Sequence, residues 1–285
     1  MLKVAGVSIL YNPDENIISN ILSYLNQVEI LYVVDNSDEK AKNRNIDFKS
    51  FAQIRTLEKK GNLGIGVALN KSAKKAIEEG YDLLLTMDQD SRITDNLVNE
   101  MVKEFEKDEK IGILAPFVIH VENPRKPANS GLEKITVAMT SGCIIRLSAY
   151  EKIGGFLEKF FIDYVDNEFC LRMISSGYKV LQLNSVYLYH KLGNTKPRNF
   201  IFKKVFPTNH SPLRWYYRTR NRLYVYHKYK NQFNKYIIFD ISVFLRDFLK
   251  ILLYECNKLK KIKMMLLGYR DYRKNKFGKC NFDSL

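Results

Sequence analysis

The sequence is poor in the residues that mark several classes of protein. It has four cysteines and no C-x-x-C pair, which argues against a zinc ribbon or a disulfide framework and fits a reducing compartment. Glycine and proline are sparse, with 14 and 7 residues in 285, and the chain has no internal repeat or low-complexity tract. Most of it is therefore expected to fold around a sizeable core. The apolar run at the N-terminus lacks a small-residue cleavage site, so we expect a first strand there and not a signal peptide.

Charge is unevenly distributed along the chain. Residues 196–285 contain 22 Lys and Arg against 5 Asp and Glu, a net charge of +17. Residues 1–195 contain 24 against 26, a net charge of −2. A near-neutral body thus carries a strongly basic segment. Such a segment is typical of a surface that binds phosphates, in nucleic acid or in anionic lipid, or of a solvated surface with no partner.

Apolar runs that alternate with amphipathic segments predict an α/β fold. Lys3–Tyr11 and Val28–Ser37 are β-branched runs that end in turn residues, and Asp14–Asn26 between them has apolar residues at helical spacing. A short strand, a helix over Gly64–Glu79 and a strand over Tyr81–Asp88 continue the alternation. This order predicts a mostly parallel central sheet flanked by helices. Ligands of such sheets bind outside the carboxyl ends of the strands.

Two carboxylates follow the buried strand "LLLTMD" at one such end. Asp88 and Asp90 form a D-x-D pair, and hard oxygen ligands at this spacing suit Mg²⁺ or Mn²⁺. His190 ends another predicted strand and is a candidate third ligand. The alternatives are that the two acids are ordinary loop residues, with Asp90 or Ser91 capping the next helix, and that His190 is structural.

Two further segments have polar residues at predicted turns. Gly61–Ala76 is a glycine-rich turn that opens a helix, which is either a phosphate-binding helix start or only a tight turn. "IDYVDNEFCLR" offers Asp163, Asp166 and Glu168 at a helix start. One of these acids can serve as general base for a hydroxyl, although Asp166 and Glu168 also fit an N-cap and a helix-dipole partner.

The order of these motifs resembles the family 2 inverting glycosyltransferases, whose nucleotide-sugar-binding domain has the GT-A fold. The resemblance spans about Ser8–Asn221. The wording "FIDYVDNEFCLR" and "YHKLGN" is similar to the rhamnosyltransferase branch, which uses dTDP-rhamnose. The segments that carry the resemblance are "VSILYN", "VVDNSD", "GNLGIGVALN", "TMDQDS", "TSGCIIRLSAYEKIGGF", "FFIDYVDNEFCLRM", "YHKLG" and "RWYYRTRN".

The resemblance implies a role for each matching position. Asp166 matches the catalytic base, although the residue before it is Val165 where the family commonly has Glu. Asp90 matches the direct metal ligand, with Asp88 and His190 beside it. Ser141 and Gly142 match an acceptor-side turn, which Asp163 is expected to support. The positions expected near the donor nucleotide are Tyr11, Asn12, Asp35, Asn62, Gly64, Asp88 and Arg220.

The expected reaction transfers a sugar to a hydroxyl of a saccharide or polyprenyl-linked acceptor in cell-surface polysaccharide synthesis. The favoured donor is dTDP-rhamnose. A Mg²⁺ or Mn²⁺ ion offsets the charge of the departing nucleotide, and Asp166 deprotonates the acceptor. A UDP-hexose-dependent enzyme of the same fold and a nucleotidyltransferase are alternatives. A different reading makes the chain a nucleic-acid-binding protein, because "RWYYRTRNRLYVYHKYK" interleaves cations with aromatic residues. We expect no nucleic-acid partner, since that reading leaves the D-x-D pair without a role.

The catalytic domain is expected at residues 1–210, with a basic, tyrosine-rich helical region at 211–285 and a soft boundary near Lys191–Asn209. Tyr236–Lys263 is apolar but interrupted by charges, so a spanning helix is not expected. We expect it to lie on the anionic inner face of the cell membrane, which makes the protein cytoplasmic and peripheral. The alternative is a core-packed C-terminal helix. On one helix, Ile238, Ile241, Leu245, Leu249 and Leu252 fall opposite Asp240, Asp247, Lys250, Lys258 and Lys261.

Overall fold

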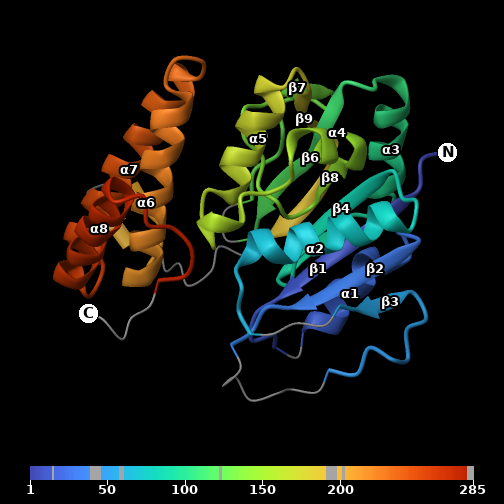
Figure 1. Ribbon diagram of the computed structural model, residues 1–285, viewed down its shortest axis with the longest axis horizontal. Coiled ribbons are helices and arrows are strands. Elements are labelled where there is room, and N and C mark those ends of the chain that lie inside the picture. Colours follow the sequence, from blue (N-terminus) through green and yellow to red (C-terminus); the bar gives the residue numbers. More distant parts are fainter. Residues whose placement is uncertain are drawn as a thin grey trace. The chain divides into compact units, whose positions relative to one another are not determined.

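The computed structural model describes residues 1–14, 16–38, 46–57, 61–121, 124–190, 198–200 and 203–280 (Figure 1). The chain forms two compact units. The first comprises Met1–Glu158 and Val165–Lys191, and the second comprises Lys159–Tyr164 and Leu192–Leu285. The expected boundary after residue 210 falls inside the second unit, and residues 191–197, with most of the "YHKLG" segment, lie outside the described residues.

The described part of the first unit contains one nine-stranded sheet with the order β3-β2-β1-β4-β8-β6-β9-β5, and β7 pairs with β9 (Figure 1). The strands β3, β2, β1 and β4 are parallel to one another, and β6 is parallel to β9, whereas β5, β7 and β8 pair antiparallel with their neighbours. The predicted α/β class is thus confirmed, with parallel order in the N-terminal half. The strands are β1 (Val4–Leu10), β2 (Ile30–Asp35), β3 (Ile54–Thr56), β4 (Leu83–Asp88), β5 (Ser91–Ile93), β6 (Ile111–His120), β7 (Leu132–Lys134), β8 (Cys143–Arg146) and β9 (Lys179–His190).

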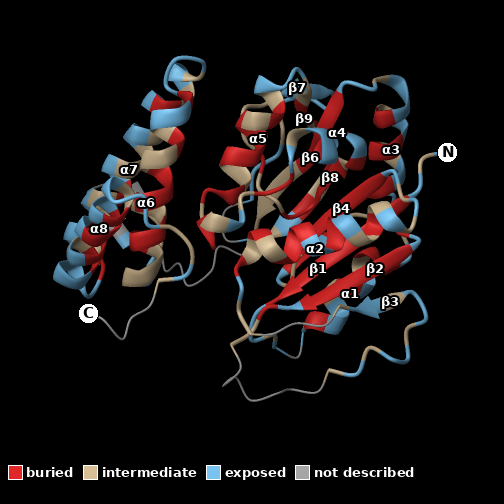
Figure 2. Cartoon of the chain, viewed as in Figure 1, coloured by how far each residue is buried: buried red, intermediate tan, exposed pale blue. Residues whose placement is uncertain are grey.

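Apolar residues on alternate positions of the strands build the main core. Leu83, Leu85 and Met87 of β4 lie in one buried cluster with residues of α1 and α3, so the intervening side chains point to the opposite face of the sheet. All seven residues of β1 are buried, as expected for a strand covered on both faces (Figure 2). The helices of this unit are α1 (Ile17–Leu25), α2 (Ile65–Glu78), α3 (Leu97–Lys107), α4 (Leu147–Ile153) and α5 (Val165–Ser175), and a 3-10 turn η1 (Glu158–Phe160) leads into the second unit.

The second unit is mainly helical. It contains α6 (Pro212–Tyr229), α7 (Asn234–Tyr254) and α8 (Lys258–Arg273), with a short hairpin of β10 (Arg198–Phe200) and β11 (Lys203–Val205). Ser211 caps α6 by accepting a hydrogen bond from the backbone N of Arg214. Pro212 lies in the first turn of α6, where a backbone N–H has no partner within the helix, so the missing N–H of proline costs nothing. In the described part of the chain, no helix has the length and apolar content needed to cross a membrane.

The single helix expected over Tyr236–Lys263 is wrong, because the structure breaks it in two. Asn257 adopts a left-handed backbone conformation, with φ of 57°. The preceding Glu255 is buried, and its carboxylate pairs with Lys261 Nζ at 2.6 Å and accepts a hydrogen bond from the backbone N of Asn209 at 2.9 Å. These bonds hold the chain between α7 and α8 in a tight turn.

Candidate active site

Parallel pairing brings the predicted donor-binding residues to one edge of the sheet. Asp35 lies beside Leu10 in the register of β1 and β2, and Asp88 lies beside Ile9 in the register of β1 and β4. Tyr11 and Asn12 therefore leave β1 between the two acids. The backbone N of Asn12 donates to Ser37 Oγ at 2.8 Å, which joins this end of β1 to the turn after β2.

The residue between the two aspartates fixes this edge. Gln89 Oε1 accepts a hydrogen bond from the backbone N of Tyr11 at 2.7 Å, and Gln89 Nε2 donates to the Tyr11 carbonyl at 3.0 Å. This pair of bonds ties the D-x-D turn to the end of β1. No local sequence pattern predicts these bonds, because the partners are far apart in the chain and only strand pairing brings them together.

Asp88, Asp90 and His190 form a candidate metal centre. One potential ligand atom from each lies within 4.8 Å of the others. His190 reaches the pair because β9 runs antiparallel to β5 with Ser91 opposite His190, and His190 Nδ1 lies 3.0 Å from Ser91 Oγ and 3.6 Å from Asp90 Oδ1. Two carboxylates and one imidazole, partly open to solvent, suit a hard divalent cation that retains water or substrate oxygens.

The Ser141–Gly142 turn lies against this centre. Ser141 Oγ accepts a hydrogen bond from the backbone N of Asp88 at 3.0 Å, and the backbone N of Gly142 donates to the Thr86 carbonyl at 2.7 Å. Gly142 has φ of 78°, and a Cβ there would come within 2.9 Å of Pro116 Cγ. Only glycine fits this approach, which explains the break that the sequence showed in this strand region.

The glycine-rich loop is also joined to the strand ends. Asn62 Oδ1 accepts a hydrogen bond from the backbone N of Gly64 at 3.1 Å, and Asn36 Oδ1 accepts one from the backbone N of Leu63 at 3.3 Å. Gly64 has φ of 93° and precedes the first turn of α2. The loop that contains Asn62 and Gly64 is therefore linked to Asn36, the residue that follows Asp35.

Two of the three acids near the start of α5 are held by arginines. Glu168 is fully buried and pairs with Arg172, whose Nη2 lies 2.8 Å from Glu168 Oε2. Asp163, in the second unit, accepts two hydrogen bonds from Arg214, at 3.2 Å from Nε and 2.5 Å from Nη2. Glu168 also fits a helix-dipole partner at this helix start, and its main contact in the structure is this buried ion pair. Both carboxylates thus have a structural partner.

Asp166 lies in the first turn of α5 and lines a narrow cavity beside Cys143 and Cys170. Burial raises the pKa of the Cys143 thiol well above its usual value, and the nearby charges of Cys170, Asp166 and Asp88 raise this pKa further. Thr140 lines the same cavity as Asp166 and precedes Ser141, whose hydroxyl accepts the hydrogen bond from the backbone N of Asp88.

The segment that precedes Asp166 is strained and tightly held. Phe161, Asp163 and Tyr164 have φ of 66°, 62° and 64°, in the left-handed region that costs a non-glycine residue free energy. The side-chain amide of Asn221 donates to the carbonyls of Phe160, Ile162 and Asp163 at 2.9 to 3.0 Å. Sequence reasoning missed Asn221 in this role, since nothing in its local pattern points to a loop 60 residues away.

Arg220 is not placed to contact a nucleotide, contrary to the expectation. Its side chain is 1% exposed, and its guanidinium donates to the Asn221 side chain, the Tyr216 hydroxyl and three backbone carbonyls. These five bonds occupy all of its N–H groups. Arg220 therefore holds the second unit together and has no donor left for a diphosphate.

Comparison with known proteins assigns the family. Residues 7–164 match the sequence profile of "Glycosyl transferase family 2", which is more than half of the chain. The chain belongs to glycosyl transferase family 2. The expected family is thus confirmed, and the enzyme is a glycosyltransferase.

Two characterised relatives differ in the sugar that their names specify. The dTDP-rhamnosyl transferase RfbF of Shigella flexneri is 26% identical over 249 residues, which cover 77% of this chain and 78% of that protein. The poly-beta-1,6-N-acetyl-D-glucosamine synthase of Staphylococcus epidermidis is 28% identical over 155 residues, which cover 50% of this chain and 35% of that protein.

Solved structures show the GT-A fold. Residues 1–349 of S. aureus TarS in complex with UDP-GlcNAc align with a TM-score of 0.65 at 14% identity, over 96% of this chain and 82% of that chain. GalNAc-T7 with UDP, GalNAc and Mn²⁺ aligns with a TM-score of 0.62 at 12% identity, over 96% of this chain and 56% of that chain. The predicted GT-A fold is confirmed.

Proposed function

We propose that this glycosyltransferase moves rhamnose from dTDP-rhamnose to a hydroxyl of a saccharide or polyprenyl-linked acceptor, with inversion at the anomeric carbon and with a divalent cation. The Asp88–Asp90–His190 cluster carries the proposal, because it supplies a cation site at the strand ends where nucleotides bind in α/β sheets. RfbF, which matches 77% of this chain, is a dTDP-rhamnosyl transferase, and this similarity favours rhamnose over a UDP-hexose as donor.

The metal site fits Mg²⁺ or Mn²⁺. Asp88, Asp90 and His190 would hold the ion, which offsets the negative charge that develops on the departing diphosphate. Ser91 and Ser141 support this set, since Ser91 contacts the His190 imidazole and Ser141 receives the Asp88 backbone N–H. We place Tyr11, Asn12, Asp35, Asn62 and Gly64 around the nucleotide.

The acceptor hydroxyl is deprotonated by Asp166 in this proposal. The acceptor oxygen then forms a bond to the anomeric carbon as the bond from that carbon to the nucleoside diphosphate breaks, so no covalent enzyme intermediate is needed. Asp166 is preferred because it lies in the first turn of α5, at the position that matches the catalytic base of the family. The Ser141–Gly142 turn lies at the acceptor side.

A nucleic-acid partner is not part of this proposal. That reading needs the aromatic residues of α6 to stack on bases, but Trp215, Tyr216 and Tyr217 are buried among other side chains of the second unit. The basic surface is instead assigned to the anionic inner face of the cell membrane, with the protein peripheral and cytoplasmic. A polyprenyl-linked acceptor would require this location.

The test is a panel of nucleotide sugars with purified full-length protein, in which release of the nucleoside diphosphate is measured with and without Mg²⁺ or Mn²⁺. We expect dTDP-rhamnose to give the fastest release, and Asp90→Asn to lose most of it because one charged ligand is removed. Full turnover in excess chelator would exclude the metal proposal. A preference for UDP-glucose would exclude rhamnose as donor and leave the glycosyltransferase assignment intact.

A further inference from the structure

Helix α7 exposes its apolar side. Leu245 and Leu249 are 54% and 56% exposed, and on a helix they share one stripe with three other exposed aliphatic residues (Figure 2). Phe239 and Leu253 beside this stripe are also exposed. Among the residues of α7, those that are buried are Ile237, Asp247 and Ile251. The stripe consists of Ile238, Ile241, Leu245, Leu249 and Leu252.

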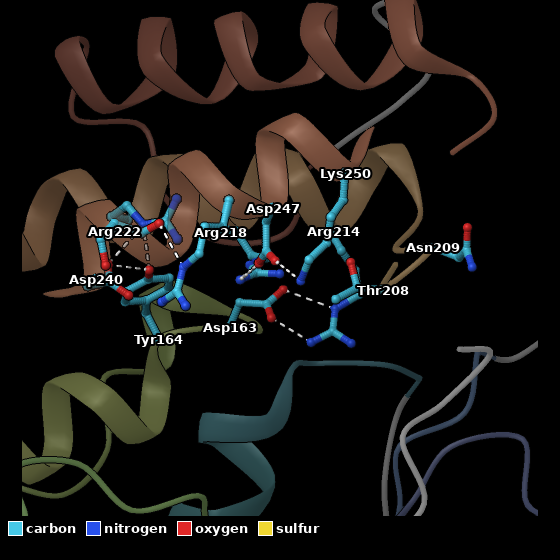
Figure 3. Close-up of polar contacts among 12 residues, drawn as sticks. Asp163, Tyr164, Thr208, Asn209, Arg214, Arg218, Arg222, Asp240, Asp247 and Lys250 are labelled. Carbon is cyan, nitrogen blue, oxygen red and sulfur yellow. Dashed lines mark hydrogen bonds and ion pairs between the residues drawn. The ribbon is translucent and has the colours of Figure 1, made fainter. Parts of the chain in front are cut away.

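Two aspartates with little solvent exposure, Asp240 and Asp247, fix α7 in this rotation (Figure 3). Asp240 accepts hydrogen bonds from Arg222 Nε at 3.0 Å, Tyr164 Oη at 2.8 Å and Tyr226 Oη at 2.6 Å. Two helical turns further along α7, the carboxylate of Asp247 lies 3.0 Å from Lys250 Nζ and 3.5 Å from Arg218 Nη2. Both carboxylates point inward, so the stripe on the opposite side of the helix must point outward.

This arrangement reverses the usual order of a helix in water, in which leucines are buried and carboxylates are exposed. Burying a charge has a desolvation cost even when the charge is paired. Leaving a row of aliphatic side chains in water forgoes the gain of burying them. Both features are favourable together only if the outer side of α7 meets an apolar medium.

Charge on the same unit identifies that medium. All five described carboxylates of the second unit are in ion pairs, and each of these side chains is at most 14% exposed. The exposed charges of its helices are cations. Lys235 and Arg246 are exposed and lie about a quarter turn from the centre of the stripe on α7. On α8, Lys260, Lys263 and Arg270 line a groove of ≈ 680 Å³ together with apolar residues.

We propose that α7 is a membrane-docking helix that lies in the surface of an anionic bilayer, with its apolar stripe among the acyl chains and Lys235 and Arg246 at the lipid phosphates. The proposal deepens the peripheral location given above and names the surface responsible. A second copy of this chain is the competing occupant. It fits less well, because two such faces would bring cationic rims together with no exposed carboxylate among the described residues of the second unit to offset them.

The test is co-sedimentation of the full chain with phosphatidylcholine vesicles that contain or lack phosphatidylglycerol. The wild type is expected to bind the phosphatidylglycerol vesicles, and Leu245→Gln with Leu249→Gln to bind them at least about tenfold more weakly. Lys235→Gln with Arg246→Gln should lose the preference for phosphatidylglycerol. The matched control is Ile18→Gln with Leu22→Gln, which changes two exposed residues of α1 and should bind like the wild type.

Three results would overturn the proposal: no wild-type binding to either vesicle, equal binding by the leucine variant, or a leucine variant that changes a dimer to a monomer while vesicle binding stays the same. The last result would assign the stripe to a second copy. Nucleoside diphosphate release with a water-soluble acceptor separates docking from catalysis. The leucine variant should retain this release, and Asp90→Asn should lose it while still binding vesicles.

Discussion

The two units of this glycosyltransferase use their carboxylates in opposite ways. In the first, Asp88 and Asp90 lie at strand ends, where Asp90 is half exposed and the pair can meet a cation from solution. In the second, Asp240 and Asp247, whose side chains are 14% and 9% exposed, are paired with arginines of α6. The first arrangement leaves negative charge available for a ligand. The second removes it from the surface, and what remains outside is cationic and apolar.

The comparison shows that the charge content of a region does not by itself determine what the region binds. The second unit is basic by composition, yet its function as a surface depends on where its few acids are placed. Because these acids pair internally, they orient α7 and leave the cations unopposed outside. Substitutions of single acids in each unit, and of His210 and Asn221 in the second unit, test this contrast.

The largest effect is expected in the first unit, at the proposed base. Asp166→Asn keeps the shape of the side chain and removes the proton acceptor, so kcat should fall by roughly 10²–10⁴-fold with donor binding nearly unchanged. Asp163→Asn and Glu168→Gln should reduce kcat clearly less, since both acids are ion-paired with arginines. Turnover by folded Asp166→Asn at the wild-type rate would refute the assignment.

Neutralising an acid of the second unit should instead affect folding. Asp240→Asn leaves the guanidinium of Arg222, which is 5% exposed, without its counter-charge, and should lower the free energy of unfolding by about 3–5 kcal/mol. Asp90→Asn is the matched change in the first unit and, in chelator, should stay within about 0.5 kcal/mol of the wild type. Urea unfolding measures both. Similar losses in the two variants would remove the contrast between the units.

Acid sensitivity should come from His210 in the second unit. Burial, together with the charges of Arg214 and Arg218, lowers the pKa of His210 from 6.5 to about 4, while the charges of Asp163 and Asp247 act in the opposite direction. Between pH 6.5 and 4 the unfolded chain therefore binds a proton that the folded chain does not, so stability falls with falling pH, by roughly 3 kcal/mol over the whole range. His210→Phe should flatten this part of the curve of unfolding free energy against pH, and an unchanged curve would exclude His210 as the cause.

The smallest effect is expected at Asn221. Asn221→Ala removes the amide that holds the carbonyls of Phe160, Ile162 and Asp163, and should lower the free energy of unfolding by roughly 1–3 kcal/mol. Because the strained segment leads directly to Asp166, kcat should fall with little change in the KM for the donor. If kcat per folded molecule is unchanged, Asn221 serves the fold alone.

Local pattern determined most of the fold. The alternation of β-branched runs with helical spacing placed β1, α1, β2, α2 and β4 within a few residues of their observed bounds, because each depends on burial of a repeating apolar face. The family resemblance added the positions around the metal centre. The D-x-D pair itself was visible, since both acids follow one buried strand.

Long-range contacts decided the rest. His190 meets Asp90 only because β9 pairs with β5, about a hundred residues away in sequence, and no local signal encodes that pairing. The Arg220 prediction failed for a related reason, because a guanidinium with five internal partners is indistinguishable in sequence from one that awaits a diphosphate.

Helix α7 shows which features the sequence determines and which depend on tertiary contacts. Its sequence determined that five aliphatic residues share one side, opposite Asp240 and Asp247, because residues three and four apart share a face of a helix. Which side is buried was decided by Arg218 and Arg222 on α6, which bind Asp247 and Asp240 and turn the aliphatic stripe outward. An amphipathic pattern does not determine which side of a helix is buried, since burial depends on the side chains of the neighbouring elements.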